Sequence, residues 1–370
     1  MKILIAPDKF KGSIDAISLC DLLRKEIVAL YPDAQVDAFP LADGGDGFAS
    51  IIQYYFGTVE VTTKTVNALG SPITATYQYA EESETAFIEM AAASGLALLK
   101  QEARNAMRAS TYGTGLMIRD AIARGAKKII LGIGGSATND GGIGMADALG
   151  YMFLDKNGDP LDPCGESLLE IEEIVMPETD LLEDVEFQVA CDVKNPLCGM
   201  DGASFVYGPQ KGASPEEVQL LDDGLKHLDE LFMKFFRRSV AEEPGAGAAG
   251  GLGAGCDIFL GARLLSGVEQ LIDSIGLESK LKEANIIITG EGCFDEQSMQ
   301  GKVVGTLARM AQQYNKRVRV ICGDSSMAGH DLGVLGIESV VTLTSIAGDQ
   351  KLSMATPQRF IREAVKQTFS

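Results

Sequence analysis

The stretch that decides the fold class is KILIAPDKFKGSIDAISLCDLLRKEIVALYPDAQVDAFPLA, residues 2–42. Its first five residues form a short apolar run that is typical of a buried strand. Apolar residues then recur at helical spacing as far as Pro32, and Ser13 stands where a helix N-cap is expected. Residues 35–42 predict a second strand. The order strand, helix, strand predicts the opening of a parallel sheet.

The C-terminal end repeats this pattern. Apolar runs predict strands at 285–290, 317–323 and 339–345, separated by an amphipathic helix and followed by a closing helix. Two strands at the front and three at the back predict one five-stranded, doubly wound sheet. This sheet is then a discontinuous domain made of residues 1–64 and 271–370.

The middle of the chain, residues 65–270, predicts an inserted α/β domain with a mixed sheet. The runs ITATYQYA and TAFIEMA are separated by EESE, which indicates a β-hairpin. A helix and the strand KKIILGI follow, and 186–193 is another strand. The segment from Ser214, with Glu217 three residues on, has the signature of a capping box and begins a long amphipathic helix. Its apolar stripe suits either a core or a homodimer interface.

Composition restricts the class of protein. The 370 residues include 32 Lys and Arg against 52 Asp and Glu, a formal net charge of -20. This balance disfavours nucleic acid and anionic membrane surfaces as partners, although an anionic small substrate remains compatible with a locally positive site. The seven cysteines are scattered without a C-x-x-C pair, as expected for reduced thiols of a cytoplasmic protein. No run approaches eighteen apolar residues, so no membrane span is expected.

Two glycine-rich segments suggest phosphate binding. GIGGSATNDGG, residues 132–142, follows an apolar run, and PGAGAAGGLGAG spans 244–255. Glycine lets backbone N–H groups approach phosphate oxygens closely. The first segment also fits G-x-G-x-x-A, with Asp155 after a plausible next strand, so an NAD(P)-dependent dehydrogenase is an alternative. The ordinary P-loop and protein-kinase motifs are absent from the sequence.

Acidic residues follow several predicted strands, where ligands of open α/β sheets bind. They are Asp8, Asp43, Asp46, Asp192, Glu291 and Asp295. Carboxylates with nucleotide phosphates commonly hold Mg²⁺. Four lysines lie in glycine-flanked loops. Placed beside the acidic loops, they would neutralise the charge of a carboxylate substrate or of a transferring phosphoryl group. These lysines are Lys9, Lys11, Lys211 and Lys302.

Nine motifs in this order resemble the bacterial glycerate kinase family of the glycerate 2-kinase type. They are APDKFKGS, ADGGDG, IEMAAASGL, TYGTG, GIGGSATNDGG, ACDVKNPLCG, GPQKGAS, PGAGAAGGLG and ITGEGCFDEQSMQGK. The resemblance covers nearly the whole chain. It implies ATP-dependent, Mg²⁺-assisted phosphorylation of D-glycerate to 2-phosphoglycerate. It also implies a flavodoxin-like discontinuous domain and an active site in a cleft between two domains.

The motifs and the strand-end pattern together give a hypothesis for each site residue. The catalytic candidates are Asp192, as the base, with Lys11 and Lys302. The metal candidates are Asp192, Glu291 and Asp295. The candidates for ATP binding are Gly134, Gly135, Ser136, Thr138, Asn139, Gly247, Gly250 and Gly251. The candidates for binding glycerate are Asp8, Ser13, Asp43 and Asn195.

Three positions depart from the family pattern that the chain resembles. The family usually has Ser at Lys9, Glu at Asp46 and Arg at Cys293. Loss of an arginine beside Glu291 removes a bidentate anion clamp, which Lys9 would replace in part. A glycerate-binding protein without catalysis is therefore a further alternative, and the sequence leaves the choice between the 2- and 3-hydroxyl open.

Overall fold

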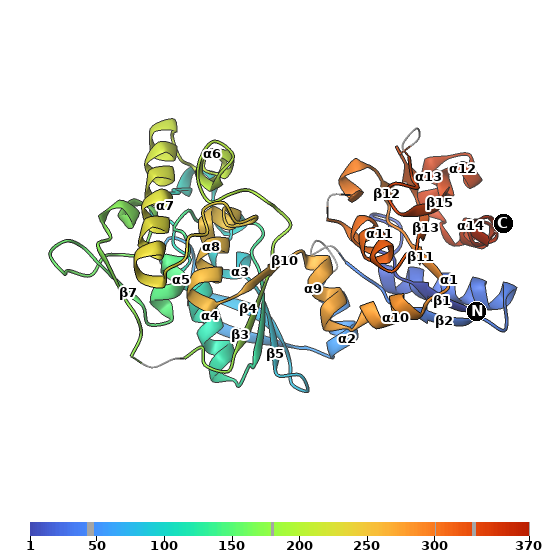
Figure 1. Ribbon diagram of the computed structural model, residues 1–370, viewed down its shortest axis with the longest axis horizontal. Helices are drawn as coiled ribbons and strands as arrows, with labels where there is room; N and C mark the ends of the chain where they lie inside the picture. Colours follow the sequence, from blue (N-terminus) through green and yellow to red (C-terminus); the bar gives the residue numbers. More distant parts are fainter. Residues whose placement is uncertain (43–47, 179–180, 300, 328–330, 370) are drawn as a thin grey trace. The chain divides into compact units, whose positions relative to one another are not determined.

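The computed structural model describes residues 1–42, 48–178, 181–299, 301–327 and 331–369 (Figure 1). The chain divides into two compact units. Unit 1 comprises Met1–Tyr55 and Ser266–Ser370, and unit 2 comprises Phe56–Leu265. Asp43 and Asp46 lie outside the described residues, so their assignments stay predictions.

The sheet of unit 1 has five parallel strands in the order β15-β13-β11-β1-β2. Counted along this unit, the order is 2-1-3-4-5, the flavodoxin-like arrangement, and the predicted fold class is confirmed. The strands are β1 (Lys2–Ile5), β2 (Gln35–Ala38), β11 (Ile286–Thr289), β13 (Val318–Cys322) and β15 (Ile337–Thr342). The chain reverses direction of winding between β1 and β11, where such sheets bind ligands at the carboxyl ends of the strands.

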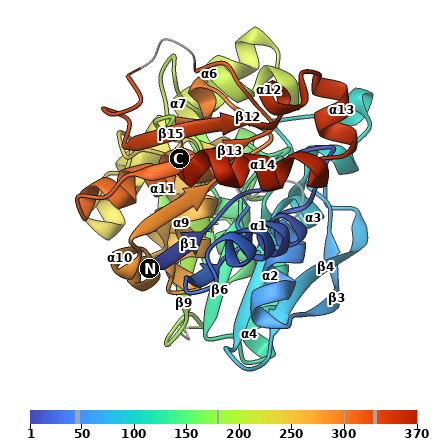
Figure 2. The same cartoon turned by 90° about the vertical axis from the view of Figure 1, so that its right-hand side faces the viewer.

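Helices pack against this sheet, and Figure 2 shows α1 and α14 side by side in front of it. The helices of unit 1 are α1 (Ala16–Leu30), α2 (Phe48–Phe56), α9 (Gly267–Ser274), α10 (Leu277–Glu283), α11 (Val303–Gln313), α12 (Leu343–Ala347), α13 (Gln350–Ala355) and α14 (Gln358–Phe369). The predicted N-cap of α1 is wrong. Asp15 is the cap, because its carboxylate accepts from the Ser18 N–H, while the Ser13 hydroxyl donates to the Met354 carbonyl at 2.6 Å.

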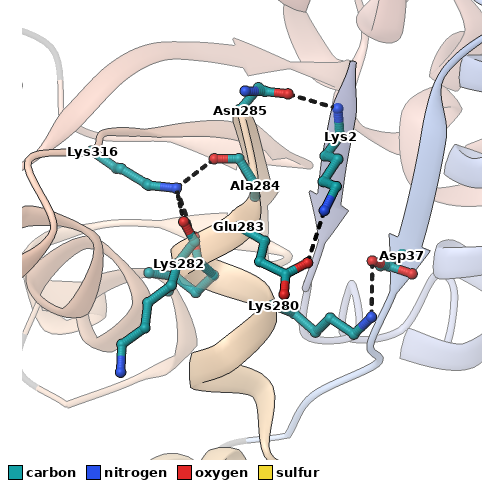
Figure 3. Close-up of polar contacts among 9 residues, drawn as sticks. Lys2, Asp37, Lys280, Lys282, Glu283, Ala284, Asn285 and Lys316 are labelled. Atoms are coloured by element: carbon teal, nitrogen blue, oxygen red, sulfur yellow. Dashed lines mark hydrogen bonds and ion pairs between the residues drawn. The ribbon is translucent and has the colours of Figure 1, made fainter.

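Polar contacts tie the C-terminal end of α10 to neighbouring strands (Figure 3). The Lys2 ammonium lies 2.9 Å from the Glu283 carboxylate, and the Lys280 ammonium lies 3.4 Å from that of Asp37. The ammonium of Lys316 donates to three carbonyl groups at the end of the helix: Leu281, Lys282 and Ala284. These carbonyls have no partner within the helix, so a lysine here satisfies groups that the helix leaves open.

Unit 2 contains a six-stranded mixed sheet in the order β10-β9-β6-β5-β4-β3. Its strands are β3 (Val59–Val66), β4 (Pro72–Ala80), β5 (Thr85–Glu89), β6 (Lys128–Gly132), β9 (Glu186–Ala190) and β10 (Arg263–Leu265). The predicted hairpin is the antiparallel pair β4 and β5, while β5, β6, β9 and β10 run parallel. The predicted domain boundary between residues 64 and 65 falls inside β3. This strand pairs with β4 along its whole length and belongs to unit 2.

The helices of unit 2 pack around a large apolar core. They are α3 (Ala91–Ser94), α4 (Tyr112–Ala123), α5 (Ile143–Ala148), α6 (Ala203–Tyr207), α7 (Pro215–Phe236) and α8 (Ala248–Leu260). The capping box of α7 is present as predicted, with Ser214 and Glu217 bonded reciprocally. The apolar stripe of α7 is buried in this core, through residues such as Leu225 and Phe232. In the described part of the chain, no helix combines the length and apolar character that spanning a membrane requires.

Candidate active site

Three parallel strands of unit 2 end at the same edge of the sheet. The register places Glu89 of β5 beside Gly132 of β6, and Gly132 beside Ala190 of β9. The loops that follow β6 and β9 therefore leave the sheet next to each other. The first is the glycine-rich segment 132–142, and the second carries Asp192, whose side chain is exposed. This is the edge at which open α/β sheets bind ligands.

The backbone of the glycine-rich loop has free donors at its tip. Gly135 accepts from the Leu96 N–H at 2.8 Å, and the Ala137 N–H donates to Ser94 at 2.9 Å, which fixes the loop from one side. The N–H groups of Gly134, Gly135 and Ser136 meet no acceptor in the described part of the chain. Gly134 and Gly135 are exposed. Consecutive N–H groups without a partner form a concavity suited to phosphate.

The side chains of this loop point into the protein rather than outward. The buried Lys211 ammonium donates to the Ser136 hydroxyl at 2.8 Å and to the Thr138 carbonyl at 2.7 Å. The Asn139 amide donates to the Ser204 hydroxyl at 3.0 Å. Ser136, Thr138 and Asn139 were all predicted to bind the nucleotide. Their side chains hold the loop in place, and its backbone is the part that faces outward.

Asp140 supports the same loop and was missed by sequence reasoning. Its fully buried carboxylate accepts from the Thr111 N–H and hydroxyl, both at 2.7 Å, and from the N–H groups of Gly142 and Gly144. Burial raises the pKa of this carboxyl, while the four hydrogen bonds oppose that rise. The signal was present in the sequence, because TYGTG contains Thr111 and NDGG contains Asp140 just before a helix.

The second glycine-rich segment packs directly on the first. A Cβ atom on Gly250 would lie 2.0 Å from the Thr138 carbonyl oxygen, and one on Gly255 would lie 2.4 Å from that of Gly141. Gly250 accepts from the Gly141 N–H at 3.0 Å. Gly250 and Gly251 have left-handed φ values of 73° and 88° at a kink in α8. Their absence of side chains lets two backbones meet, which is a structural reason for glycine at these positions.

Two further predicted residues lie in this part of unit 2. A Cβ atom on Gly247 would lie 2.1 Å from the Pro196 carbonyl oxygen, so Gly247 also permits a close backbone approach. Asn195 donates to the Asp201 carbonyl at 2.8 Å and accepts from the Tyr207 hydroxyl at 2.7 Å. Asn195 thus braces the loop that carries Asp192, and its proposed contact with glycerate stays a prediction.

Unit 1 gathers most of the other predicted residues around one cavity of about 430 Å³. The predicted site residues that line it are Asp8, Lys11, Ser13, Glu291, Asp295 and Lys302. Lys9 and Cys293, two positions that depart from the family pattern, line it as well. The cavity lies at the ends of β1 and β11, because the loops after these parallel neighbours supply most of its acidic and basic groups. It is large enough for a small organic acid.

Glu291 is the most perturbed group in this cavity. The residue is 7% exposed, and its Oε1 atom has no hydrogen-bond partner among the described residues. Its other oxygen lies 4.0 Å from the Lys302 ammonium. Burial raises the pKa of Glu291 to about 7, while a hydrogen bond with the Ser298 side chain and the charge of Lys302 oppose this rise. A buried carboxylate oxygen without a partner is a suitable ligand for a hard cation such as Mg²⁺.

The three candidate metal ligands do not form a single cluster within one unit. Asp192 belongs to unit 2, whereas Glu291 and Asp295 belong to unit 1. The described residues contain no group of three or more His, Cys, Asp or Glu side chains arranged to hold a metal. Mg²⁺ is commonly bound by one or two carboxylates together with substrate phosphates and water. Glu291 and Asp295, which share the cavity, fit that kind of site.

We expect Glu291→Gln to change how stability depends on pH. The folded-state pKa of about 7 lies above the ordinary 4.5, so folding stabilises the protonated form. That stabilisation is complete below about pH 4.5 and is lost as the pH rises to about 7. Without Mg²⁺, the variant should therefore gain up to about 3 kcal/mol relative to wild type between pH 4.5 and 8. Urea unfolding of wild type and variant at both pH values measures this difference, and an equal change in the two proteins would contradict it.

The dinucleotide-binding alternative does not agree with the strands that follow the glycine-rich loop. Asp155 follows β7 (Met152–Leu154), which pairs antiparallel with β8 (Glu173–Val175) in a separate two-stranded sheet. A dinucleotide fingerprint requires this strand to lie parallel in the same sheet as the first. Asp155 instead accepts from the N–H groups of Asn157 and Asp159 in a tight turn.

The chain is similar to known proteins over nearly its whole length. The sequence profile of the glycerate kinase family matches residues 3–370. A glycerate kinase of Halalkalibacterium halodurans is 42% identical over 343 residues, which cover 92% of this chain and 90% of the relative. The glycerate 2-kinase of Escherichia coli K12 is 42% identical over 351 residues, covering 94% and 91%. A crystal structure from Salmonella typhimurium LT2, provisionally named glycerate kinase 2, has a TM-score of 0.82 and 37% identity, covering 100% of this chain and 97% of that one.

A doubly wound sheet with acidic and basic groups at its strand ends, together with these relatives, defines a kinase that acts on a small molecule. The particular family is equally clear. The chain belongs to the glycerate kinase family.

Proposed function

We propose that this protein transfers the γ-phosphoryl group of ATP to D-glycerate, with Mg²⁺, to form 2-phosphoglycerate. Family membership supports the acceptor, and the similarity to a glycerate 2-kinase supports the 2-hydroxyl. The observation that carries the proposal furthest is the run of N–H groups at Gly134, Gly135 and Ser136. Such a run suits the phosphates of a nucleotide.

The proposed roles follow the chemistry of each side chain. Asp192 accepts the proton of the attacking hydroxyl as that oxygen bonds to the γ-phosphorus, while the bond from this phosphorus to the β–γ bridging oxygen breaks and ADP leaves. Lys11 and Lys302, which line the cavity of unit 1, offset the charge of the glycerate carboxylate and of the transferring group. Asp8 and Ser13 line the same cavity and are proposed to orient glycerate there. Glu291 and Asp295 are proposed to hold Mg²⁺, which when bound neutralises charge on the phosphate oxygens.

The cysteines bear on where the protein acts. All seven are free thiols: four are buried, Cys191 and Cys198 are half-buried, and Cys293 is exposed. Free thiols are the usual state in a reducing compartment. We therefore propose the cytoplasm as the location. A homodimer stays a prediction.

The proposed reaction is tested by measuring ADP release from purified protein with ATP, Mg²⁺ and D-glycerate. We expect turnover that requires all three, and ³¹P NMR of the product should show a phosphate on the 2-hydroxyl. A product phosphorylated on the 3-hydroxyl would overturn that part of the proposal alone. Glycerate binding without ADP release would instead support a binding protein that has lost catalysis, and would point to Lys9 and Cys293 in the cavity.

A further inference from the structure

Lys211 occupies an unusual place for a lysine. It ends the 3₁₀ turn Pro209–Lys211, and only 2% of its surface is exposed. The turn is held against another segment, because the Arg104 guanidinium donates to the Gln210 carbonyl and Gly212 packs on the Arg104 carbonyl. Lysine is almost never fully buried unless it is paired. The position of this ammonium therefore requires an explanation.

The contacts of Lys211 all lead to the glycine-rich loop. Its Nζ atom donates to the Ser136 hydroxyl and to the Thr138 carbonyl, residues that lie more than seventy positions away in the sequence. Ser136 also supplies the last of the three unpaired N–H groups at the tip of the loop. The Lys211 side chain thus fixes the Ser136 hydroxyl and the Thr138 carbonyl at the same time.

We propose that Lys211 is a positioning residue for the nucleotide: its buried side-chain nitrogen holds the loop so that the N–H groups of residues 134–136 face the phosphates. The inference deepens the proposed function and rests on it. Lys211 need not touch the ligand, since it acts through Ser136 and Thr138.

The cost of burying this ammonium argues against a role in packing alone. Burial lowers the pKa of Lys211 to about 7, and the charge of Asp140 opposes that shift. An unbranched apolar side chain of similar length, such as methionine, would fill the space without desolvating a charge. If packing were the only role, Lys211→Met would be close to neutral for the free energy of unfolding and for ligand binding.

The test uses Lys211→Met in the full-length protein. Isothermal titration calorimetry gives the Kd of MgATP, and steady-state kinetics give kcat with KM for ATP and for glycerate. We expect the Kd and KM for ATP to rise about 10- to 100-fold, the loss expected for charge-assisted hydrogen bonds, with KM for glycerate little changed. Lys156→Met, which removes one exposed charge in unit 2, is the matched control and should change neither constant.

A second variant keeps the test valid if Lys211→Met does not fold. Ser136→Ala removes one acceptor of the ammonium and leaves the charge in place, and we expect it to raise the Kd of MgATP about 3- to 10-fold. Where both variants fold, their effects on Kd should be non-additive in the double variant, because they break one interaction.

The outcomes separate this inference from the function on which it rests. Wild-type protein that binds no MgATP would overturn the proposed function and the inference with it. Wild-type binding that Lys211→Met leaves within about twofold, whatever happens to the melting temperature, would overturn the role of Lys211 alone. A raised Kd for MgATP with an unchanged KM for glycerate would support it.

Discussion

Asp192→Asn is expected to lower kcat by about 10²- to 10⁴-fold, the usual contribution of general-base catalysis. Asparagine has nearly the same shape but cannot accept the hydroxyl proton. The side chain is exposed in the loop after β9, so the substitution should barely change the free energy of unfolding. The register of β6 and β9 brings this loop out beside the N–H groups proposed to bind phosphate, which is where a base for phosphoryl transfer is needed.

The control for this variant is Asp201→Asn, which removes the same charge from another exposed residue of that loop. Turnover of Asp192→Asn near that of wild type would rule out the assignment of Asp192 as base. Titration with Mg²⁺ separates the two roles given to this residue. If excess Mg²⁺ restores turnover, Asp192 acts as a metal ligand, whereas a loss that Mg²⁺ leaves unchanged supports the base.

The sequence predicted the parts of the fold that local patterns determine. Strands of the parallel sheet in unit 1 such as β1 (KILI) and β11 (IIIT) are short apolar runs, and they alternate with amphipathic helices, so alternation indicated a doubly wound sheet. The capping box at Ser214 is local too, and it is present. Local reasoning failed at α1, where Ser13 and Asp15 are both good caps. The hydroxyl of Ser13 bonds to Met354, far along the chain, which leaves Asp15 to cap the helix.

The candidate site was predictable where it depends on strand ends. Asp8 and Glu291 line one cavity because they follow strands that turn out to be neighbours. The motif NDGG held a signal for the support that Asp140 gives the glycine-rich loop, but the support from Lys211 was not predictable, because it comes from a distant residue. The ammonium of Lys211 reaches Ser136 across a gap of 75 positions, and no periodicity or motif spacing encodes such a contact. The pattern of glycines in 244–255 suggested a ligand, yet Gly250 is required because the backbone at Thr138 packs directly against it.

That packing leads to the second large effect, which is expected for Gly250→Ala. The added Cβ would lie 2.0 Å from the Thr138 carbonyl oxygen and 2.6 Å from the Asn139 Cα atom. Both are backbone atoms, so no side-chain rotation relieves the overlap, and the φ of 73° disfavours any L-residue as well. We expect the free energy of unfolding to fall by about 4 kcal/mol or more, the size of change reserved for severe core defects. Urea unfolding of the full chain measures it.

Gly261→Ala is the matched control, because Gly261 ends the same helix with a φ of 61° but has no atom within 4 Å of its ideal Cβ position. Backbone strain alone should then cost about 1 kcal/mol. The difference between the two variants isolates the contact between the glycine-rich segments. Since that contact also sets the position of Thr138, Gly250→Ala protein that still folds should bind MgATP more weakly, whereas Gly261→Ala should bind it as wild type does. Equal stability of the two variants would contradict the view that Gly250 is retained for this backbone contact.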